Sequence, residues 1–335
     1  MSPASSRPAI SGGQEFDSGR FPSRDHRRSG FDLRAGYGVN DPSYGEERVV
    51  AIVNPATRGN AARLVDMLRA AAPRHVMLDV HFTERPGHGA ELARQSLGGA
   101  TTMIAIGGDG TVAEVAGAVR GSGIPLGIVP AGSTNIVAQE LGIPTNIRRN
   151  VDMLFGVHKI IAIDIGICGE RAFLHMAGAG FDSAFFSLTD PRLKRRVGWL
   201  AYLPAAVQAL NQHPFRLQIQ TPDTKIEVAS PLVLVANGAS IINPRFRLNS
   251  LIRNDDGLLD VLVITATTPV ELARVFARLA TLQLERSPYL IHITASEVSI
   301  ASEPMIDVEL DGDVVERTPV VFTVDPRAVR VIVPA

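Results

Sequence analysis

Residues 102–120 read TMIAIGGDGTVAEVAGAVR, and this stretch decides the class of fold. A short apolar run, 102–106, leads directly into the motif Gly107-Gly108-Asp109-Gly110-Thr111 and then into a helix-forming run, 112–120. Glycines at such a turn permit positive φ and let the backbone approach a ligand closely. The free N–H groups and the dipole at the start of the following helix favour an anion. The motif therefore predicts a phosphate site at a strand-to-helix turn.

Three further strands, predicted at 49–53, 76–82 and 126–129, also lead into turns that open helices. Strands that alternate with helices predict a parallel sheet with helices on both faces. The turn after 126–129 reads PAGSTN, and its Ser133, Thr134 and Asn135 are short hydrogen-bonding residues at a helix start. Helix capping alone would explain them. Two polar turns at the carboxyl ends of strands favour a binding site instead, because ligands of open α/β sheets bind there.

After about Asp164 the pattern changes to strands with polar turns, predicted at 216–220, 232–236, 259–264, 298–301 and 306–310. One helix interrupts them: Thr268 is its cap, Pro269 its first residue and Glu271 completes a capping box, with apolar residues to about Leu284. The chain is thus predicted to be an α/β protein of two domains. Residues 47–164 form the α/β domain, and residues 165–318 form a mostly antiparallel β-sandwich.

The composition of the 335-residue chain is that of a globular protein, with 45% hydrophobic and 20% charged residues. A formal net charge of −1 gives no basic surface of the kind that nucleic acids need, so no nucleic-acid partner is expected. The single cysteine, Cys168, excludes an internal disulfide and is expected to be a small buried hydrophobe. No apolar run has the length of a membrane span. We expect a cytoplasmic protein whose membrane contact, if any, is peripheral.

Two segments have no predicted role in the core. Residues 1–46 are rich in Ser, Gly, Pro, Arg and Asp and predict a disordered tail, whose arginines would be solvated or touch anionic lipid. The basic residues Arg192 and 194–196 precede 199–203, which reads WLAYL. Basic residues beside Trp and Tyr suit a membrane interface, and a partly buried helix with a solvated basic end explains them equally well.

Other features limit the chemistry. The chain contains no Gly-Lys-Ser/Thr, so the glycine motif is not a Walker A loop, and no Gly-x-Gly-x-x-Gly follows a strand. Asp109 would repel a bare phosphate, which predicts contact through Mg²⁺ or water, unless Asp109 only caps the helix. By spacing alone, Asp311-Gly312-Asp313 predicts a hairpin turn, and Asp256-Gly257 predicts another turn.

Taken in order, the motifs resemble those of diacylglycerol-kinase-like lipid kinases. The likeness covers the chain from Val49 to its C-terminus, and the matching segments are Asn54-Pro55, Thr83, Gly107–Thr111, Gly132–Asn135, Gly180–Asp182, Asn237-Gly238, Asp256–Asp260 and Asp311–Asp313. Gly-Gly-Asp-Gly-Thr alone is shared with NAD kinases and phosphofructokinases; the ordered series is more specific. The resemblance implies a kinase that transfers the γ-phosphate of ATP to a lipid hydroxyl, such as that of diacylglycerol. It also implies that residues 319–335 return to pack on the first domain.

The resemblance further implies a set of site residues. The ATP contacts would be Asn54, Pro55, Ala56, Thr57, Arg58, Thr83, Gly107, Gly108, Asp109, Gly110, Thr111, Val112, Ala113, Ser133 and Asn135. Asp109 would organise a catalytic Mg²⁺. The carboxylate of Asp256 and the backbone oxygens of Arg253 and Leu258 would hold a structural Mg²⁺. The general base aligns with Asp313, or with Asp311 beside it. The implied partners are a lipid at a membrane surface and a possible second copy of the chain.

Three departures from the family pattern bear on this reading. Ile136 stands where the family has Asp, 241–243 (Ile-Ile-Asn) replaces a Gly-Gly-Gly segment, and Asp313 is one methylene shorter than the family's Glu. Two alternatives stay open. One is an NAD-kinase-like enzyme, because NAD kinases share the Gly-Gly-Asp-Gly turn; against it, Gly132–Asn135 resembles the second loop of the lipid kinases. The other is a nucleotide-binding regulator without turnover.

Overall fold

The computed structural model of this chain describes residues 47–57, 60–180, 214–240, 248 and 251–335. The predicted tail, the basic segment 192–203, Arg58, Asp182 and the segment 241–243 lie outside the described residues.

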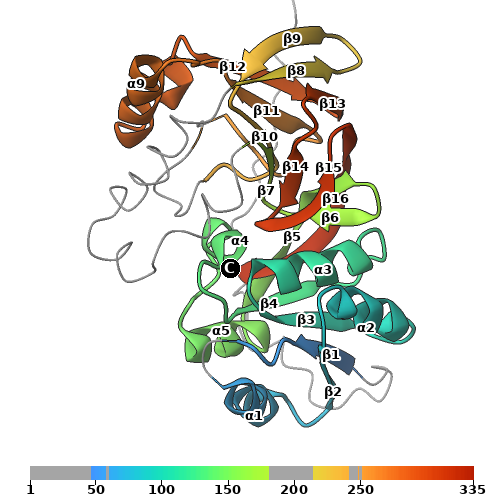
Figure 1. Cartoon of the computed structure of the whole chain (residues 1–335). Helices are drawn as coiled ribbons and strands as arrows, with labels where there is room; N and C mark the ends of the chain where they lie inside the picture. The colour runs from blue at the N-terminus through green and yellow to red at the C-terminus, as the bar shows by residue number, and fades with distance from the viewer. Residues whose placement is uncertain (1–46, 58–59, 181–213, 241–247, 249–250) are drawn as a thin grey trace, which may run out of the picture. The chain divides into compact units, whose positions relative to one another are not determined.

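The first part of the described chain is a parallel sheet with helices on both faces. Strands β1, β2, β3 and β4 run parallel in the order β2-β1-β3-β4. Helices α2 and α3 pack together on one face, and α1 and α5 on the other (Figure 1). The elements are β1 (Glu47–Val53), α1 (Ala61–Ala71), β2 (Val76–Phe82), α2 (His88–Ser96), β3 (Thr102–Gly107), α3 (Asp109–Val119), β4 (Leu126–Pro130), α4 (Ile136–Glu140) and α5 (Ile147–Leu154).

Burial along these strands explains their composition. All five residues of 49–53 and all of 103–107 are buried, as expected for central strands covered on both faces. The edge strand β2 is different, because Met77 and Phe82 are 47% and 46% exposed. Continuous apolar runs therefore mark the centre of the sheet, and the more polar 76–82 marks its edge.

The second part is mostly antiparallel. A six-stranded sheet has the order β12-β11-β10-β7-β14-β15, while β13, β8 and β9 extend the first sheet beyond β16. No helix in the described ranges is long and apolar enough to cross a membrane. The elements are β5 (His158–Cys168), β6 (Arg171–Phe173), β7 (Met176–Ala179), β8 (Phe215–Gln220), β9 (Lys225–Ser230), β10 (Leu232–Ala236), β11 (Leu259–Ile264), α9 (Pro269–Ala280), η2 (Leu284–Arg286), β12 (Leu290–Ala295), β13 (Glu297–Glu303), β14 (Asp307–Leu310), β15 (Asp313–Arg317) and β16 (Val320–Pro334).

The long strand β16 belongs to two hydrophobic cores. Its C-terminal half pairs with β5 and, through Val331, with Leu126 of β4, and 331–333 is buried in the α/β core. Its N-terminal half pairs with β13, and Phe322 packs edge-on against Phe173 in the β core, with ring centroids 6.0 Å apart. Both halves of the fold therefore depend on this one strand.

The predicted fold class, a parallel α/β part followed by an antiparallel β part, is confirmed. The expected burial of Cys168 is also confirmed: it is 3% exposed, and burial raises the pKa of its thiol to about 11. The predicted end of the last helix near Leu284 is wrong, because α9 ends at Ala280. Leu282 has φ 55°, a left-handed conformation that no α-helix continues through, and only a short 3₁₀ turn follows.

A buried carboxylate that the sequence did not predict ties the two parts together. Asp164 on β5 is fully buried and accepts hydrogen bonds from the N–H groups of Gly257 and Arg327, both at 2.7 Å. Its own N–H donates to Asn254 O at 2.7 Å. Arg327 has φ 50° and lies where β16 shifts register against β5. Asp164 thus fixes both the loop before β11 and the irregularity of β16.

We predict that Asp164→Asn lowers the free energy of unfolding by about 1–3 kcal/mol, because an NH₂ group would face a backbone N–H in a buried site. Urea denaturation of the full chain measures the change. Asp66→Asn is the matched control, since the Asp66 side chain is 75% exposed and its change should stay within about 0.5 kcal/mol. Equal effects for the two variants would contradict the role given to Asp164.

Candidate active site

The loops that follow β1, β3 and β4 are tied to one another. Asn54 N donates to Ile106 O at 2.9 Å, and Ala131 N donates to Gly107 O at 2.8 Å. The Asn54 side chain also donates to Thr111 Oγ1 at 3.2 Å. The carboxyl ends of three parallel strands therefore form one connected edge, where ligands of open α/β sheets bind.

Positive φ is not what the glycines of the motif supply, so that part of the prediction is wrong, and at Gly107 and Gly108 a Cβ would be crowded. Gly107, Gly108 and Gly110 are absent from the positive-φ residues of the described chain, and Gly108 has φ −88°. A Cβ atom at Gly132 would lie 2.5 Å from Gly108 Cα, and one at Gly107 would lie 2.6 Å from the Thr111 side chain. The two glycine loops are in direct backbone contact.

Asp109 connects the two loops. Helix α3 begins at Asp109 itself, with Gly108 as the N-cap, so the motif is already helical there. Asp109 Oδ1 accepts from Val137 N at 3.2 Å, in the first turn of α4. Asp109 therefore caps the neighbouring helix and not its own. Its second oxygen, Oδ2, has no hydrogen bond to any residue in the described part of the chain, which leaves one carboxylate oxygen at the loop edge.

In the second loop, Asn135 and Ile136 shape the structure. Asn135 has φ 50°, accepts from Gly132 N at 2.8 Å and donates to Gly132 O at 3.0 Å. Both polar atoms of its side chain are thus used by its own loop. Ile136 is 5% exposed and packs in the α/β core. Ser133 is exposed, so a ligand can reach its hydroxyl.

The first loop and Thr83 are also ordered by backbone contacts. Asn54 Oδ1 accepts from Ala56 N at 2.9 Å, and Thr83 N donates to Val53 O at 2.8 Å. Thr83 is 7% exposed. Thr57 Oγ1 is buried and has no hydrogen-bond partner among the residues that the structure describes. A hydroxyl of this kind next to the glycine loops is a candidate ligand contact.

Glu114 is a positioning residue that the sequence analysis missed. It lies on α3, and its two carboxylate oxygens accept from Gly87 N at 2.7 Å and Gly89 N at 2.9 Å. Those N–H groups begin α2, so the charge of Glu114 meets the positive end of that helix. The signal was the Gly-x-Gly spacing at 87–89, where a Cβ at Gly89 would lie 2.6 Å from Glu114 Oε2.

Asp311 and Asp313 differ sharply although they stand two residues apart. Asp311 and Gly312 have φ 48° and 97° and form the predicted hairpin turn between β14 and β15. The Asp311 carboxylate accepts from three consecutive N–H groups, those of Leu174, His175 and Met176, at 2.9–3.1 Å. Burial raises the pKa of Asp311, and the charge of His175 and these N–H groups oppose that rise.

Asp313 is the accessible carboxylate of the pair. It is exposed, and its Oδ2 lies 3.5 Å from where a Cβ on Gly110 would be. Gly110 is in the first turn of α3, beside the glycine loops. The structure therefore brings Asp313 and the glycine motif together from opposite halves of the chain, while Asp311 holds the turn that carries Asp313.

The segment predicted to hold a structural Mg²⁺, residues 253–258, forms a turn before β11. Asp256 Oδ1 accepts from Leu258 N at 3.1 Å, and Arg253 binds Asp255 at 2.9 and 3.0 Å. Burial and the charges of Asp260 and Asp164 raise the pKa of Asp256. Within the described ranges no three His, Cys, Asp or Glu side chains form a metal cluster. One carboxylate plus backbone oxygens in a negative potential still suits a hard divalent cation.

Comparison with known proteins bears on this arrangement. Residues 48–168 match the family model of the diacylglycerol kinase catalytic domain, and residues 175–333 match that of the YegS C-terminal NAD kinase β-sandwich-like domain. The chain belongs to the diacylglycerol-kinase-like family of lipid kinases. The family resemblance predicted from the ordered motifs is therefore confirmed.

Individual members of the family are moderately similar to this chain. A "Probable lipid kinase YegS-like" from Pseudomonas aeruginosa is 30% identical over 267 residues, which cover 77% of this chain and 85% of the relative. One of the same description from Chromohalobacter salexigens is 30% identical over 243 residues, covering 70% and 77%. A solved diacylglycerol kinase from Bacillus anthracis shares the fold, with a TM-score of 0.63 at 20% identity over 86% of this chain and 97% of that one.

This family member carries a buried ion pair that the sequence analysis did not predict. Glu140, at the end of α4, accepts from Ser240 N at 2.7 Å and from the Ser240 hydroxyl. Its Oε2 lies 3.3 Å from His175 Nδ1, with both side chains no more than 15% exposed. A Cβ at Gly238 would lie 2.2 Å from that nitrogen, so Gly238 is needed to make room for the pair.

The surroundings of the pair shift the pKa values of both groups toward their charged forms. Burial alone would raise the pKa of Glu140, but the hydrogen bonds and charge of His175 and Ser240 lower it below its ordinary value. Burial alone would lower the pKa of His175, but Glu140, Asp311 and Asp109 raise it above its ordinary value. Both pKa shifts favour an ionised Glu140–His175 pair, and this pair lies beside the turn that holds Asp311.

We predict that Gly132→Ala lowers the free energy of unfolding by about 1–3 kcal/mol, because its Cβ would force the two glycine loops apart. Gly98→Ala is the control, since nothing lies within 4 Å of a Cβ there. Thermal and urea denaturation of both variants measure the difference. A Gly132→Ala variant as stable as Gly98→Ala would contradict the backbone contact.

We predict a pH-dependent effect of His175→Gln. Because the pKa of His175 is raised, the stability that His175 contributes is fully present below its ordinary pKa of 6.5 and is lost as pH rises through the raised pKa. Because the pKa of Glu140 is lowered, the stability that Glu140 contributes is fully present above its ordinary pKa of 4.5 and is lost as pH falls through the lowered pKa. The variant should lose most stability, about 3–5 kcal/mol, between those two pH values.

Urea denaturation of wild type and variant from pH 4 to pH 9 tests this prediction. The difference should shrink toward alkaline pH as His175 loses its charge. The matched control is His75→Gln, whose side chain is 72% exposed and which should change stability little at any pH. A difference that stays constant across the range would contradict the ionised pair.

Proposed function

We propose that the chain is a Mg²⁺-dependent kinase that transfers the γ-phosphate of ATP to the hydroxyl of a lipid such as diacylglycerol. The observation that carries this proposal is the position of Asp313, an exposed carboxylate next to Gly110 at the start of α3. A phosphate site and a proton acceptor at one place are the two parts that phosphoryl transfer to an alcohol requires. A lipid acceptor implies peripheral contact with a membrane.

The glycine loops would bind the phosphates of ATP. The N-terminus of α3 supplies free N–H groups and a positive dipole end, and the glycines leave the backbone open to close approach. Asn54 and Thr83 border the same edge through the bonds described above, and Thr57 N donates to Asn54 O at 3.3 Å. The hydroxyls of Thr57 and Ser133 are the side-chain groups that we assign to nucleotide contact.

The carboxylates fit the metal ions that the family implies. Asp109 Oδ2 is the oxygen that we assign to the catalytic Mg²⁺, directly or through water. Asp256, with the backbone oxygens of Arg253 and Leu258, would hold the structural Mg²⁺. When bound, Mg²⁺ neutralises the charge that develops on the transferred phosphoryl group. The chain's own residues orient the loops on which this depends, because Asp109 also fixes the start of α4.

Asp313 would accept the proton of the lipid hydroxyl as that oxygen attacks the γ-phosphorus, while the bond from the γ-phosphorus to the bridging oxygen breaks and ADP leaves. Asp311 would not share this role, since its oxygens already accept three backbone N–H groups. Its part is to hold the hairpin turn in place, so we call it a positioning residue. Because Asp is shorter than the family's Glu, the acceptor hydroxyl must come closer to the β14–β15 turn.

Each of the two alternative functions is supported by one specific observation. The match of 175–333 to an NAD kinase β-sandwich-like model favours NAD as a possible acceptor. The buried Ile136, in place of an Asp that would face the ligand, favours a nucleotide-binding regulator without turnover. We prefer the active lipid kinase, because the carboxylates at 109 and 313 are both retained.

A transfer assay with γ-labelled ATP and Mg²⁺ tests the proposal. The acceptors are diacylglycerol, sphingosine and ceramide in mixed micelles, with NAD as a soluble comparator. Label in an organic-phase product supports a lipid kinase. Label only on NAD supports the NAD-kinase alternative, and bound ATP with no transfer to any acceptor supports the regulator.

We predict that Asp313→Asn lowers turnover by about 10²–10⁴-fold, the range for loss of a general base, with ATP binding retained. Asp313→Glu should keep turnover, because this variant retains a carboxylate at position 313. Asp307→Asn is the control on the neighbouring strand, where the exposed Asp307 pairs only with exposed Arg317. An Asp313→Asn variant with full turnover would remove Asp313 from the mechanism.

A further inference from the structure

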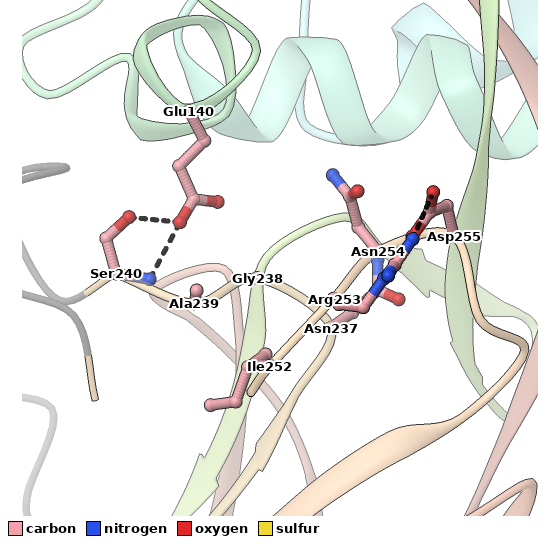
Figure 2. A pocket seen from close by; sticks show the side chains of 9 residues that line it. All are labelled: Glu140, Asn237, Gly238, Ala239, Ser240, Ile252, Arg253, Asn254 and Asp255. Atoms are coloured by element: carbon pink, nitrogen blue, oxygen red, sulfur yellow. Dashed lines mark hydrogen bonds and ion pairs between the residues drawn. The ribbon is translucent and has the colours of Figure 1, made fainter. Parts of the chain in front are cut away.

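Helix α4 begins at the glycine loops and ends at the β part of the fold. Asp109 caps its start by accepting from Val137 N at 3.2 Å, and 136–138 pack in the α/β core. Glu140 is the last residue of the helix, and the Ser240 N–H and hydroxyl both donate to one oxygen of its carboxylate (Figure 2). One short helix therefore connects Asp109 with the segment that follows β10.

The other carboxylate oxygen of Glu140 holds His175. Glu140 Oε2 lies 3.3 Å from His175 Nδ1, a buried nitrogen with no hydrogen bond to any residue in the described ranges. A cavity of about 220 Å³ borders Glu140 and Ser240, so close packing does not hold the end of α4 on that side. In the described part of the chain, the Glu140 carboxylate therefore makes the polar contacts that join α4 to the β part.

The backbone of His175 is bound in turn to the β14–β15 hairpin. His175 N donates to Asp311 Oδ1 at 3.1 Å, and Asp311 N donates to Met176 O at 2.8 Å. These bonds join the start of β7 to the turn formed by Asp311 and Gly312. Asp313 follows directly after this turn. The place of the start of β7 therefore influences the place of Asp313.

Together these contacts form a closed path through both parts of the fold. Its members, in order, are Asp109, α4, Glu140, His175, Asp311 and Asp313. The path closes because Asp313 Oδ2 lies 3.5 Å from the place of a Cβ on Gly110, the residue after Asp109. Supporting contacts of this kind hold a reacting group within a few tenths of an ångström of its productive position.

We propose that Glu140 is a positioning residue for the phosphoryl transfer, which acts through His175 to hold Asp313 against the glycine loops. This inference rests on the proposed function. It gives Glu140 no contact with ATP, metal or lipid. Misplacement of a reacting group by about 1 Å costs roughly 10²-fold in rate, so such a residue affects turnover without touching the substrate.

Glu140→Ala tests the proposal, because it removes the contacts to both His175 and Ser240, and the bordering cavity gives water access to Ser240. The acceptor is diacylglycerol, sphingosine or ceramide in mixed micelles, whichever the wild-type protein labels. We expect kcat to fall at least about 10-fold, while the Kd for ATP with Mg²⁺ changes less than about 3-fold. The matched control is Glu227→Ala, at an exposed residue of β9, which should change neither value.

A double-mutant cycle separates positioning from a general loss of structure. When Glu140→Ala is added to Asp313→Asn, kcat should fall less than about 3-fold further, because no carboxylate is left at position 313 to be positioned. A purely structural role of Glu140 would give the same fold-loss in both backgrounds.

Hydrogen exchange supplies a second readout that needs no turnover. The amides of 174–176 donate to Asp311, and in Glu140→Ala they should exchange at least about 10-fold faster than in wild type. The amides of 217–219, in the buried strand β8, should be unchanged. If Glu140→Ala does not fold, Glu140→Asp replaces it in every measurement, since the shorter side chain keeps the charge but does not reach His175 and Ser240 together.

The outcomes separate this inference from the proposed function. Unchanged kcat in a folded Glu140→Ala variant, equal fold-losses in the two backgrounds, or unchanged exchange at 174–176 would each overturn the positioning role and leave the lipid kinase standing. No transfer by the wild-type protein to any lipid, with ATP bound, would overturn the proposed function and the positioning role with it.

Discussion

The direct backbone contact between Gly108 and Gly132 is the constraint on which the candidate site depends. No side chain separates the two loops, so the starts of α3 and α4 come close enough for Asp109 of one to cap the other. Asn135 then closes its loop on Gly132 from the other side. Because α4 is short, its far end places Glu140 against the β part of the fold. The absence of side chains at Gly108 and Gly132 thus determines where several charged groups lie.

Most of the acidic side chains around this site act on the backbone. Glu114 holds the start of α2, Asp164 holds the loop before β11, and Asp311 holds the start of β7. For Asp311 the N–H groups belong to the buried residues 174–176, and each would cost about 1–3 kcal/mol if it were left without a partner. Asp313 differs from its neighbour Asp311 because it remains exposed and is not bound to backbone N–H groups in the described chain. For this reason the proposed proton acceptor is Asp313 and not Asp311.

The sequence predicted those features of the structure that local patterns of residues determine. Runs such as 49–53 and 232–236 marked strands, the Thr268–Glu271 box marked the start of α9, and the motif series marked the family. Local patterns could not show that Asp311 and Asp313 have different surroundings, because the difference comes from residues 174–176. For the same reason the Glu140–His175–Ser240 contacts, between residues 35 and 100 positions apart in sequence, were missed. A short motif such as Asp-Gly does not show which distant residues will pack against it.

Strand β16 has a consequence for how the chain acquires its structure. The α/β sheet uses Val331 beside β4, although β4 ends about 200 residues earlier in the sequence. When only the first 160 residues have emerged from the ribosome, the sheet of the nascent chain therefore has an unpaired edge at β4. Contacts of such large sequence separation form slowly, because loop-closure entropy opposes them until both ends are present. We expect the nascent α/β part to need protection from aggregation until residues near Val333 have emerged.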